Sequence, residues 1–277
     1  MPLYITSLNS GSNANCYYIG NNDDGVLIDA GLSCRETEKR MKLLGLSMNN
    51  VKAIFISHEH TDHINGIESI SKKYQLPVYI TESTFKNSYV SIASHLRKPF
   101  LHNNIITIGA LSVTAFKKSH DATDPHSFMI SSSGINIGII TDIGYACEEV
   151  INYFSICDAA FLESNYCEEM LANGSYPFHL KKRISGKQGH LSNTQALELF
   201  TKYRSKNLQL LVLSHLSKNN NTTEKVAALF QPHAGNTKIV VASRYESTAL
   251  FCIEALPTAF SYVKKRFEKN KDQLSLF

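Results

Sequence analysis

A histidine-rich segment at residues 57–63 limits, more than any other feature, what this chain can fold into. It reads Ser-His-Glu-His-Thr-Asp-His and follows the apolar, β-branched run 51–56, which predicts a buried strand. Apolar residues then recur at helical spacing, which predicts a helix from about His63 to Tyr74. The polar residues therefore lie on a tight loop between a strand end and a helix start.

This loop can serve two metal ions that share one cleft. His58 and His60 are two residues apart and can point the same way, whereas Asp62 and His63 leave the turn in another direction. Imidazole and carboxylate ligands together suit zinc, manganese or iron. The pattern predicts a metal centre, and a surface loop that is merely rich in histidine is the alternative.

Three more candidate ligands stand further along the chain, each after an apolar run. They are His120, Asp142 and His215, which follow predicted strands ending at residues 116, 141 and 214. Strand termini at one edge of a sheet can converge their side chains on a common point. Taken alone, each is more often a surface or core residue, but their shared position after strands favours one site.

Strands and helices are predicted in both halves of the chain. Near the start, the patterns predict strands at 4–8, 16–19 and 26–28 and a helix that begins with a capping box of Ser33 and Glu36. A further helix is predicted at about 83–96. Clustered strands with helices between them suggest two sheets packed face to face with helices outside.

The H-x-H-x-D-H pattern at 58–63 resembles the signature of the metallo-β-lactamase-fold hydrolases. The resemblance implies an α/β fold, a four-layer αβ/βα sandwich of two mixed sheets with outer helices. It also implies two divalent metal ions, zinc or manganese. By resemblance, one ion is bound by His58, His60 and His120, the other by Asp62, His63 and His215, and Asp142 bridges them.

Such a pair of ions makes hydrolysis the natural reaction. Two ions about 3.5–4 Å apart can share a water, lower its pKa and turn it into hydroxide near neutral pH. They also hold the substrate oxygens and stabilise charge in the transition state. We count Asp62 among the catalytic residues as well as among the ligands.

Glu163 and His190 form a candidate proton relay, the first at the end of a predicted strand and the second just before a predicted helix at 193–203. The carboxylate would fix the tautomer of the imidazole and raise its pKa, and the imidazole would donate to a leaving oxygen. The pair resembles the strand-end Glu and the Gly-His-Ser/Thr histidine of the ribonuclease Z-like nucleases, and is not known from the lactamase and glyoxalase branches. A surface histidine beside a helix start is the alternative.

More closely, the chain resembles the YycJ/WalJ-type family, bacterial proteins of this fold proposed to act as 5′-to-3′ DNA exonucleases. The resemblance covers residues 3–255 and rests on the metal loop and on motifs at 10–15, 119–125, 141–144, 163–165, 176–184 and 189–193. It implies the following substrate contacts: Asn15, Asn165, Lys181, Lys182 and Arg183. The three basic residues would meet phosphates, with a solvated helix face as the alternative.

One position departs from that family. Ala14 stands where its Gly-Ser-x-Gly-Asn turn usually has the second glycine. If the turn requires a positive φ there, alanine is disfavoured and the contact assigned to Asn15 is weakened.

We expect a hydrolase domain at 1–256 and a basic C-terminal tail at 257–277. The tail ends in Gln-Leu-Ser-Leu-Phe, which resembles the peptide by which bacterial replication and repair proteins bind the DNA sliding clamp. The residues that would bind the clamp are Gln273, Leu274, Leu276 and Phe277. A segment that folds back on its own domain is the alternative. A clamp partner would favour DNA over RNA.

Composition adds few limits. A net charge of +4 argues neither for nor against nucleic acid. No apolar run approaches the ~20 residues of a membrane span, and no signal peptide is visible, so we expect a cytoplasmic protein. Scattered cysteines without a C-x-x-C pair, several in apolar runs as Cys16 and Cys252 are, favour buried reduced thiols.

The sequence therefore predicts a metal-dependent phosphodiesterase, a DNA exonuclease of repair or replication. Three rival functions remain open. They are an RNA nuclease of the same branch, a thioester or lactone hydrolase, and a non-catalytic adaptor tethered to the clamp.

Overall fold

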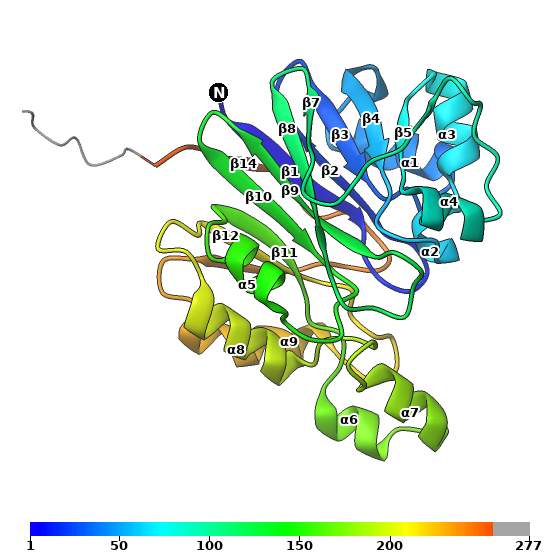
Figure 1. Cartoon of the computed structure of the whole chain (residues 1–277). Coiled ribbons are helices and arrows are strands. Elements are labelled where there is room, and N and C mark those ends of the chain that lie inside the picture. The colour runs from blue at the N-terminus through cyan, green and yellow to red at the C-terminus, as the bar shows by residue number, and fades with distance from the viewer. Residues whose placement is uncertain (257–277) are drawn as a thin grey trace, which may run out of the picture.

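The structure is a computed structural model and describes residues 1–256. Two seven-stranded sheets pack face to face between helices, which confirms the predicted four-layer sandwich (Figure 1). In spatial order, the first sheet consists of β14 (Phe251–Ile253), β1 (Leu3–Asn9), β2 (Cys16–Gly20), β3 (Gly25–Ile28), β4 (Val51–Phe55), β5 (Val78–Tyr79) and β6 (Arg97–Lys98). The second consists of β13 (Lys238–Val241), β12 (Leu210–Ser214), β11 (Ala159–Glu163), β10 (Ile135–Ile140), β9 (His126–Ser132), β8 (Leu111–Lys117) and β7 (Ile105–Ile108).

Helices form the outer layers. On the first sheet these are α1 (Cys34–Leu43), α2 (Thr61–Ile64), α3 (Ile67–Tyr74) and α4 (Glu82–Asn87), and on the second α5 (Glu148–Phe154), α8 (Asn193–Tyr203) and α9 (Thr223–Phe230). Two short helices, α6 (Glu168–Asn173) and α7 (Phe178–Ile184), project from the body near the ends of the strands (Figure 1). The 3₁₀ turns Met48–Asn50 and Gln231–His233 complete the helical elements of the described chain.

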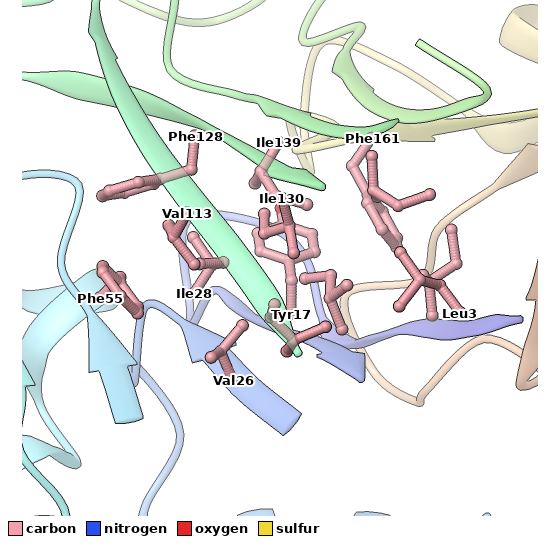
Figure 2. Close-up of a cluster of buried hydrophobic side chains, with 14 of the residues drawn as sticks. Leu3, Tyr17, Val26, Ile28, Phe55, Val113, Phe128, Ile130, Ile139 and Phe161 are labelled. Carbon is pink, nitrogen blue, oxygen red and sulfur yellow. The ribbon is translucent and has the colours of Figure 1, made fainter. Parts of the chain in front are cut away.

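The inner faces of the two sheets make the main core (Figure 2). Phe55 of β4 meets Phe128 of β9 with ring centroids 5.8 Å apart, and Tyr17 of β2 meets Phe161 of β11 at 5.0 Å. Edge-on and tilted aromatic pairs of this kind add to the free energy gained from burying the rings. This core fixes the position of one sheet relative to the other.

The direction of the strands brings their carboxyl ends to one edge. Strands β3 to β6 run parallel, and so do β10 to β13. Strand β8 is antiparallel to β9, which is antiparallel to β10, so β8 ends at the same edge as β10. The polar residues that follow these strands are therefore neighbours in space.

The predicted helix at 83–96 is too long. Helix α4 ends at Asn87, and Ser88 is extended (φ −89°, ψ 147°) with its hydroxyl donating to the carbonyl of Phe85. The residues that follow include Val90 and Ile92, which pack against the outer core of the first sheet. Serine side chains that bond locally and β-branched residues are poor helix formers, and the apolar periodicity here reports burial of an irregular segment.

The helix predicted from His63 is divided in two. Gly66 separates α2 from α3, and its amide donates to the carbonyl of Ala30 at 2.7 Å. A Cβ atom at this position would lie 1.9 Å from the carbonyl oxygen of Leu32, so only glycine permits the approach. At α1, Ser33 caps the helix, but the carboxylate of Glu36 accepts from Arg40 instead of completing a capping box.

The predictions for the cysteines, for membrane spans and for the C-terminal tail have different outcomes. All six cysteines are free thiols; Cys16 is buried as expected, whereas Cys252 is exposed because it faces outward on the edge strand β14. Within residues 1–256 no helix is both long and apolar enough to cross a membrane. The tail 257–277 lies outside the described residues, and with it the four predicted clamp contacts Gln273, Leu274, Leu276 and Phe277.

Candidate active site

A left-handed backbone turns side chains inward at three strand ends. Asp29, Asp142 and His215 follow β3, β10 and β12 and have φ angles of 60°, 55° and 57°. Residues other than glycine rarely adopt this conformation, which costs about 1–3 kcal/mol at each position and concentrates at functional sites. The edge where these strands end is therefore the candidate active site.

The loop between β4 and α2 supplies the first sheet's share of the site. His58 and His63 are fully buried, and His60 is partly buried. Nε2 of His58 lies 3.0 Å from Nδ1 of His60, so the two ring nitrogens converge. Two nitrogens bound to one zinc at 2.0–2.1 Å in a tetrahedral shell lie about 3.4 Å apart, which is close to this separation.

The predicted ligands from both sheets come together. They form two groups, each with ligand atoms within 4.8 Å of one another: His58, His60 and His120 in one, and Asp62, His63 and His215 in the other.

Asp142 lies between these groups. Its Oδ2 atom is 3.5 Å from Nε2 of His63, and its Oδ1 atom is 3.3 Å from Nδ1 of His215 and 3.9 Å from Nε2 of His120. The carboxylate thus faces both groups, as a bridging ligand would.

Several ligand atoms have no hydrogen-bond partner among the described residues. Nε2 of His120, Nε2 of His215 and Oδ2 of Asp142 are buried and unpaired. A buried polar atom without a partner costs about 1–3 kcal/mol, and such atoms in a native site call for an explanation. Divalent cations between the two groups would satisfy all three, so the residues present fit a metal centre.

The other ring nitrogen of each buried histidine is held by the protein. Nδ1 of His63 lies 2.7 Å from Oδ2 of Asp29, and Nδ1 of His120 lies 3.0 Å from the carbonyl oxygen of Gly189. Nδ1 of His58 lies 2.8 Å from Oγ of Ser57, whose hydroxyl donates to Asp29. Because carboxylate and carbonyl oxygens only accept, Nδ1 carries a proton in each of these histidines, and Nε2 is the ring nitrogen left to face a metal.

Asp29 and Ser57 are residues that the sequence prediction missed. Asp29 is 1% exposed, and its Oδ1 atom also accepts from the backbone amide of Ser57 at 2.8 Å. The signal was present, since Asp29 follows an apolar strand in the same way as Asp142 and His215. The spacing alone does not show that Asp29 orients a metal ligand rather than binding the metal itself.

Glu163 connects the metal site to the candidate acid. This fully buried carboxylate accepts at Oε1 from Nδ1 of His190 at 2.8 Å and from Nδ1 of His215 at 2.9 Å. Its Oε2 atom accepts from the backbone amides of Ile143 and Leu191 at 2.8 and 3.2 Å. Both imidazoles are therefore protonated at Nδ1, and Nε2 of each is directed away from Glu163.

A capping box holds the start of the helix that follows His190. Ser192 caps α8 and forms a capping box with Gln195, which fixes the backbone that carries His190. The side chain of His190 is 22% exposed and lines a cavity of about 190 Å³. It is therefore within reach of a substrate, whereas Glu163 is not.

Burial and charge set the protonation of the site. Burial lowers the pKa of His120 to about 4, so this imidazole is neutral near pH 7. Burial alone would raise the pKa of Asp142, but the charges of His215 and His63 outweigh it and hold this pKa well below the usual range. Burial also opposes ionisation of Asp62, but the charge of His63 favours it, and the pKa of Asp62 falls to about 2. The ionised carboxylates create a field that favours cations at this position.

Asn15, which was predicted to contact substrate, lies behind the ligands. It is fully buried, and its amide nitrogen is 3.1 Å from Oδ2 of Asp62 and 3.0 Å from Nε2 of His63. A direct substrate contact does not fit this burial, and the side chain is placed to position Asp62 instead. Ala14 is not among the positive-φ residues of the turn, where Gly11 has φ 151°, so the departure from the family pattern introduces no strain.

The other predicted substrate residues lie around the opening of the site. Asn165 lines the cavity in front of His190 and donates to the carbonyl of His215 at 2.7 Å. Lys182 and Arg183 line a second cavity of about 550 Å³, and Arg183 pairs with Asp121 at 2.6 Å. Lys181 donates to the carbonyl of Ala172 at 2.6 Å within the α6–α7 projection and lies outside these cavities.

Several known proteins are similar to this chain in sequence. Residues 25–216 match the family model described as the beta-lactamase superfamily domain. Exodeoxyribonuclease YycJ of Bacillus anthracis is 34% identical over 227 residues, which are 81% of this chain and 86% of the relative. The chain belongs to the YycJ/WalJ family of this superfamily. A second member, exodeoxyribonuclease WalJ of Streptococcus pneumoniae serotype 2 (strain D39), is 31% identical over 222 residues, 78% of this chain and 82% of the relative.

Solved structures agree on the fold. The metallo-beta-lactamase fold protein YhfI from Bacillus subtilis aligns with a TM-score of 0.70 at 16% identity and covers 91% of this chain and 100% of its own. Membership in the YycJ/WalJ family and the ligand geometry together identify the protein as a metal-dependent hydrolase.

Asp29→Asn should weaken metal binding about 10- to 100-fold, as loss of a ligand-orienting partner typically does. An amide would place an NH₂ group against either the Ser57 amide or Nδ1–H of His63, so one donor would meet another donor. Equilibrium dialysis followed by elemental analysis measures the change. Asp158→Asn is the matched control, because Asp158 is also buried and accepts from a backbone amide but lies at the start of β11. Equal metal affinity in both variants would contradict the role of Asp29.

Proposed function

We propose that this YycJ/WalJ-family hydrolase is a dinuclear metal-dependent phosphodiesterase that degrades DNA from an end, in the 5′-to-3′ direction, in repair or replication. The observation that carries the proposal is the 2.8 Å contact between Glu163 and His190 beside the ligand cluster. It provides a proton donor for an alkoxide leaving group, which phosphodiester cleavage needs and which hydrolysis of thioesters does not. The exodeoxyribonuclease names of the two relatives support DNA as the substrate.

Two of the side-chain groups at this edge support a division of the proposed ligands between two ions. One divalent ion would be held by His58, His60 and His120, the second by Asp62, His63 and His215, with Asp142 between them. Zinc or manganese ions bound there would supply hydroxide near neutral pH and stabilise negative charge on the phosphoryl oxygens. The pairing of three imidazoles with carboxylates suits either metal.

The protein's own groups would then act on the leaving oxygen. Nε2 of His190 donates a proton to it, while Glu163 accepts the hydrogen bond from Nδ1 and stabilises the charged imidazole before transfer. Asn165, Lys182 and Arg183 surround the cavities next to His190 and would bind the sugar-phosphate chain. Asn15 positions Asp62.

A direct test uses protein reloaded with manganese or zinc and incubated with end-labelled single-stranded DNA, duplex DNA and RNA of matched sequence. We expect mononucleotides to be released from DNA ends, and Asp142→Ala to lower kcat by about 10²–10³-fold or more, because charge stabilisation at the reacting phosphorus is lost. A strong preference for RNA would favour the rival nuclease. A metal-replete sample that leaves every nucleic acid intact would refute the proposal.

His190→Ala should lower kcat on DNA by about 10²–10⁴-fold without changing metal content, because the acid is lost while the ligands remain. Steady-state kinetics and elemental analysis of the same sample measure both quantities. His179→Ala, an exposed histidine on the neighbouring α7, is the matched control and should be silent. Full activity in His190→Ala would point to the thioester or lactone hydrolase.

The C-terminal sequence provides a proposed partner, the DNA sliding clamp. Leu274, Leu276 and Phe277 would enter a hydrophobic groove, as short apolar anchors in terminal peptides do. Deletion of residues 273–277 should abolish retention on immobilised clamp and leave exonuclease turnover unchanged, whereas equal retention of the shortened chain would exclude the peptide. Clamp binding without any turnover in the full chain would favour the adaptor.

A further inference from the structure

A cavity of about 670 Å³ opens beside the metal site and is separate from the cavity that His190 lines, although Arg183 borders both. Its inner wall contains His60 and Asp62, two of the proposed ligands. Its outer wall consists of residues that follow α2 and end α4, among them Asn65, Asn87 and Tyr89. A molecule in this cavity would therefore contact the reacting centre directly.

Tyr89 stands fully exposed at this cavity, with a relative exposure of 103%. Its backbone is nevertheless held on both sides. The amide of Ser88 donates to the carbonyls of Thr84 and Phe85 at the end of α4, and the amide of Ser91 donates to the carboxylate of Glu68 on α3. A large aromatic ring on a fixed backbone, with no stacking partner among residues 1–256, offers a preformed face to a ligand.

The charge around the site differs between its two sides. The Tyr89 cavity has the carboxylates of Glu59 and Glu68 in its wall, which repel phosphate. The neighbouring cavity has Lys182 and Lys187 in its wall, which attract phosphate, and its one carboxylate, Asp121, is paired with Arg183. Arg183 lines both cavities, so it lies where the acidic and basic sides meet.

We propose that the Tyr89 cavity is a nucleobase subsite, in which a base next to the scissile phosphate stacks on Tyr89 while the sugar-phosphate chain follows Arg183 toward the basic side. This inference rests on the proposed nuclease function and extends it to the form of the substrate. A base is flat and uncharged, and it carries donors and acceptors that Asn65 and Asn87 can meet, so it suits an aromatic face between carboxylates.

An unstacked base can reach Tyr89 only from a single strand. The subsite therefore selects single-stranded ends over blunt duplex ends, for which a base pair must first open. Because every base has a π-face, stacking gives affinity without sequence preference. That combination suits an enzyme that removes nucleotides one after another.

The first experiment compares wild type, Tyr89→Ala and Tyr89→Trp on single-stranded DNA with a normal or an abasic residue at each position that flanks the scissile bond. We expect Tyr89→Ala to raise KM about 5- to 30-fold on the normal strand, the lower part of the range for loss of one stacked base, and Tyr89→Trp to restore it. With an abasic residue at one flanking position, the KM of wild type should rise by the same factor as Tyr89→Ala raises it on the normal strand. Wild type and Tyr89→Ala should then have the same KM on that abasic strand. Tyr203→Ala, an exposed tyrosine on α8, is the control.

A second measurement separates the subsite from the chemistry. A phosphorothioate-linked single strand with 2-aminopurine at the same position is mixed with metal-loaded protein, and stacking on Tyr89 should quench its fluorescence in wild type and Tyr89→Trp but not in Tyr89→Ala. Quenching without hydrolysis of ordinary strands would refute the nuclease and retain the base site. Equal KM for wild type and Tyr89→Ala on the normal strand, or a loss that is the same on abasic strands, would overturn the subsite.

Discussion

The packing of the two inner sheet faces is the constraint on which the site depends. The first sheet contributes Asp29 and the loop 58–63, and the second contributes the ligands that follow β8, β10 and β12. No contact within either sheet sets the distance between these two sets. It depends on contacts between the sheets. Phe161 and Phe55, which form aromatic pairs in the inter-sheet core, lie two residues before Glu163 and Ser57. Near the site, the amide of His126 donates to the carbonyl of Ser57, and that of His215 to the hydroxyl of Ser10. A change in the packing of the core would therefore also change the distances within the candidate active site.

Anchoring at Nδ1 prepares these buried imidazoles to bind a metal ion. Four histidines from three segments of the chain place Nδ1 against an acceptor of the protein and leave Nε2 toward the centre: His58, His63, His120 and His215. This fixes both tautomer and ring orientation before any metal arrives, so little ordering entropy is lost on binding. The strained backbone at Asp29, Asp142 and His215 has the same effect, since the fold maintains it at a cost in stability.

Sequence predicted the local parts of the site and missed what depends on three-dimensional contact. The metal loop, the strands around it and the strand-end positions of Asp142 and His215 follow from periodicity and spacing, and the family resemblance supplied their grouping. Asn15 was assigned to substrate because the motif indicates importance but not burial. The helix at 83–96 was overextended because Val90 and Ile92 are apolar at helical spacing yet pack as an irregular segment. Its true conformation is what presents Tyr89.

Glu163 shows how one carboxylate can tie binding to catalysis. Its Oε1 atom accepts from both His190 and His215, so charge that develops on one imidazole changes the hydrogen bond available to the other. Its Oε2 atom accepts from the amides that follow Asp142 and His190, so the proposed bridging ligand and the proposed acid are held by the same group through the backbone as well. Burial opposes ionisation of Glu163, but the charge of His190 favours it. The pKa of Glu163 falls to about 2, and the carboxylate stays charged. A neutral amide could not accept four such bonds, because its NH₂ group would face two of the donors.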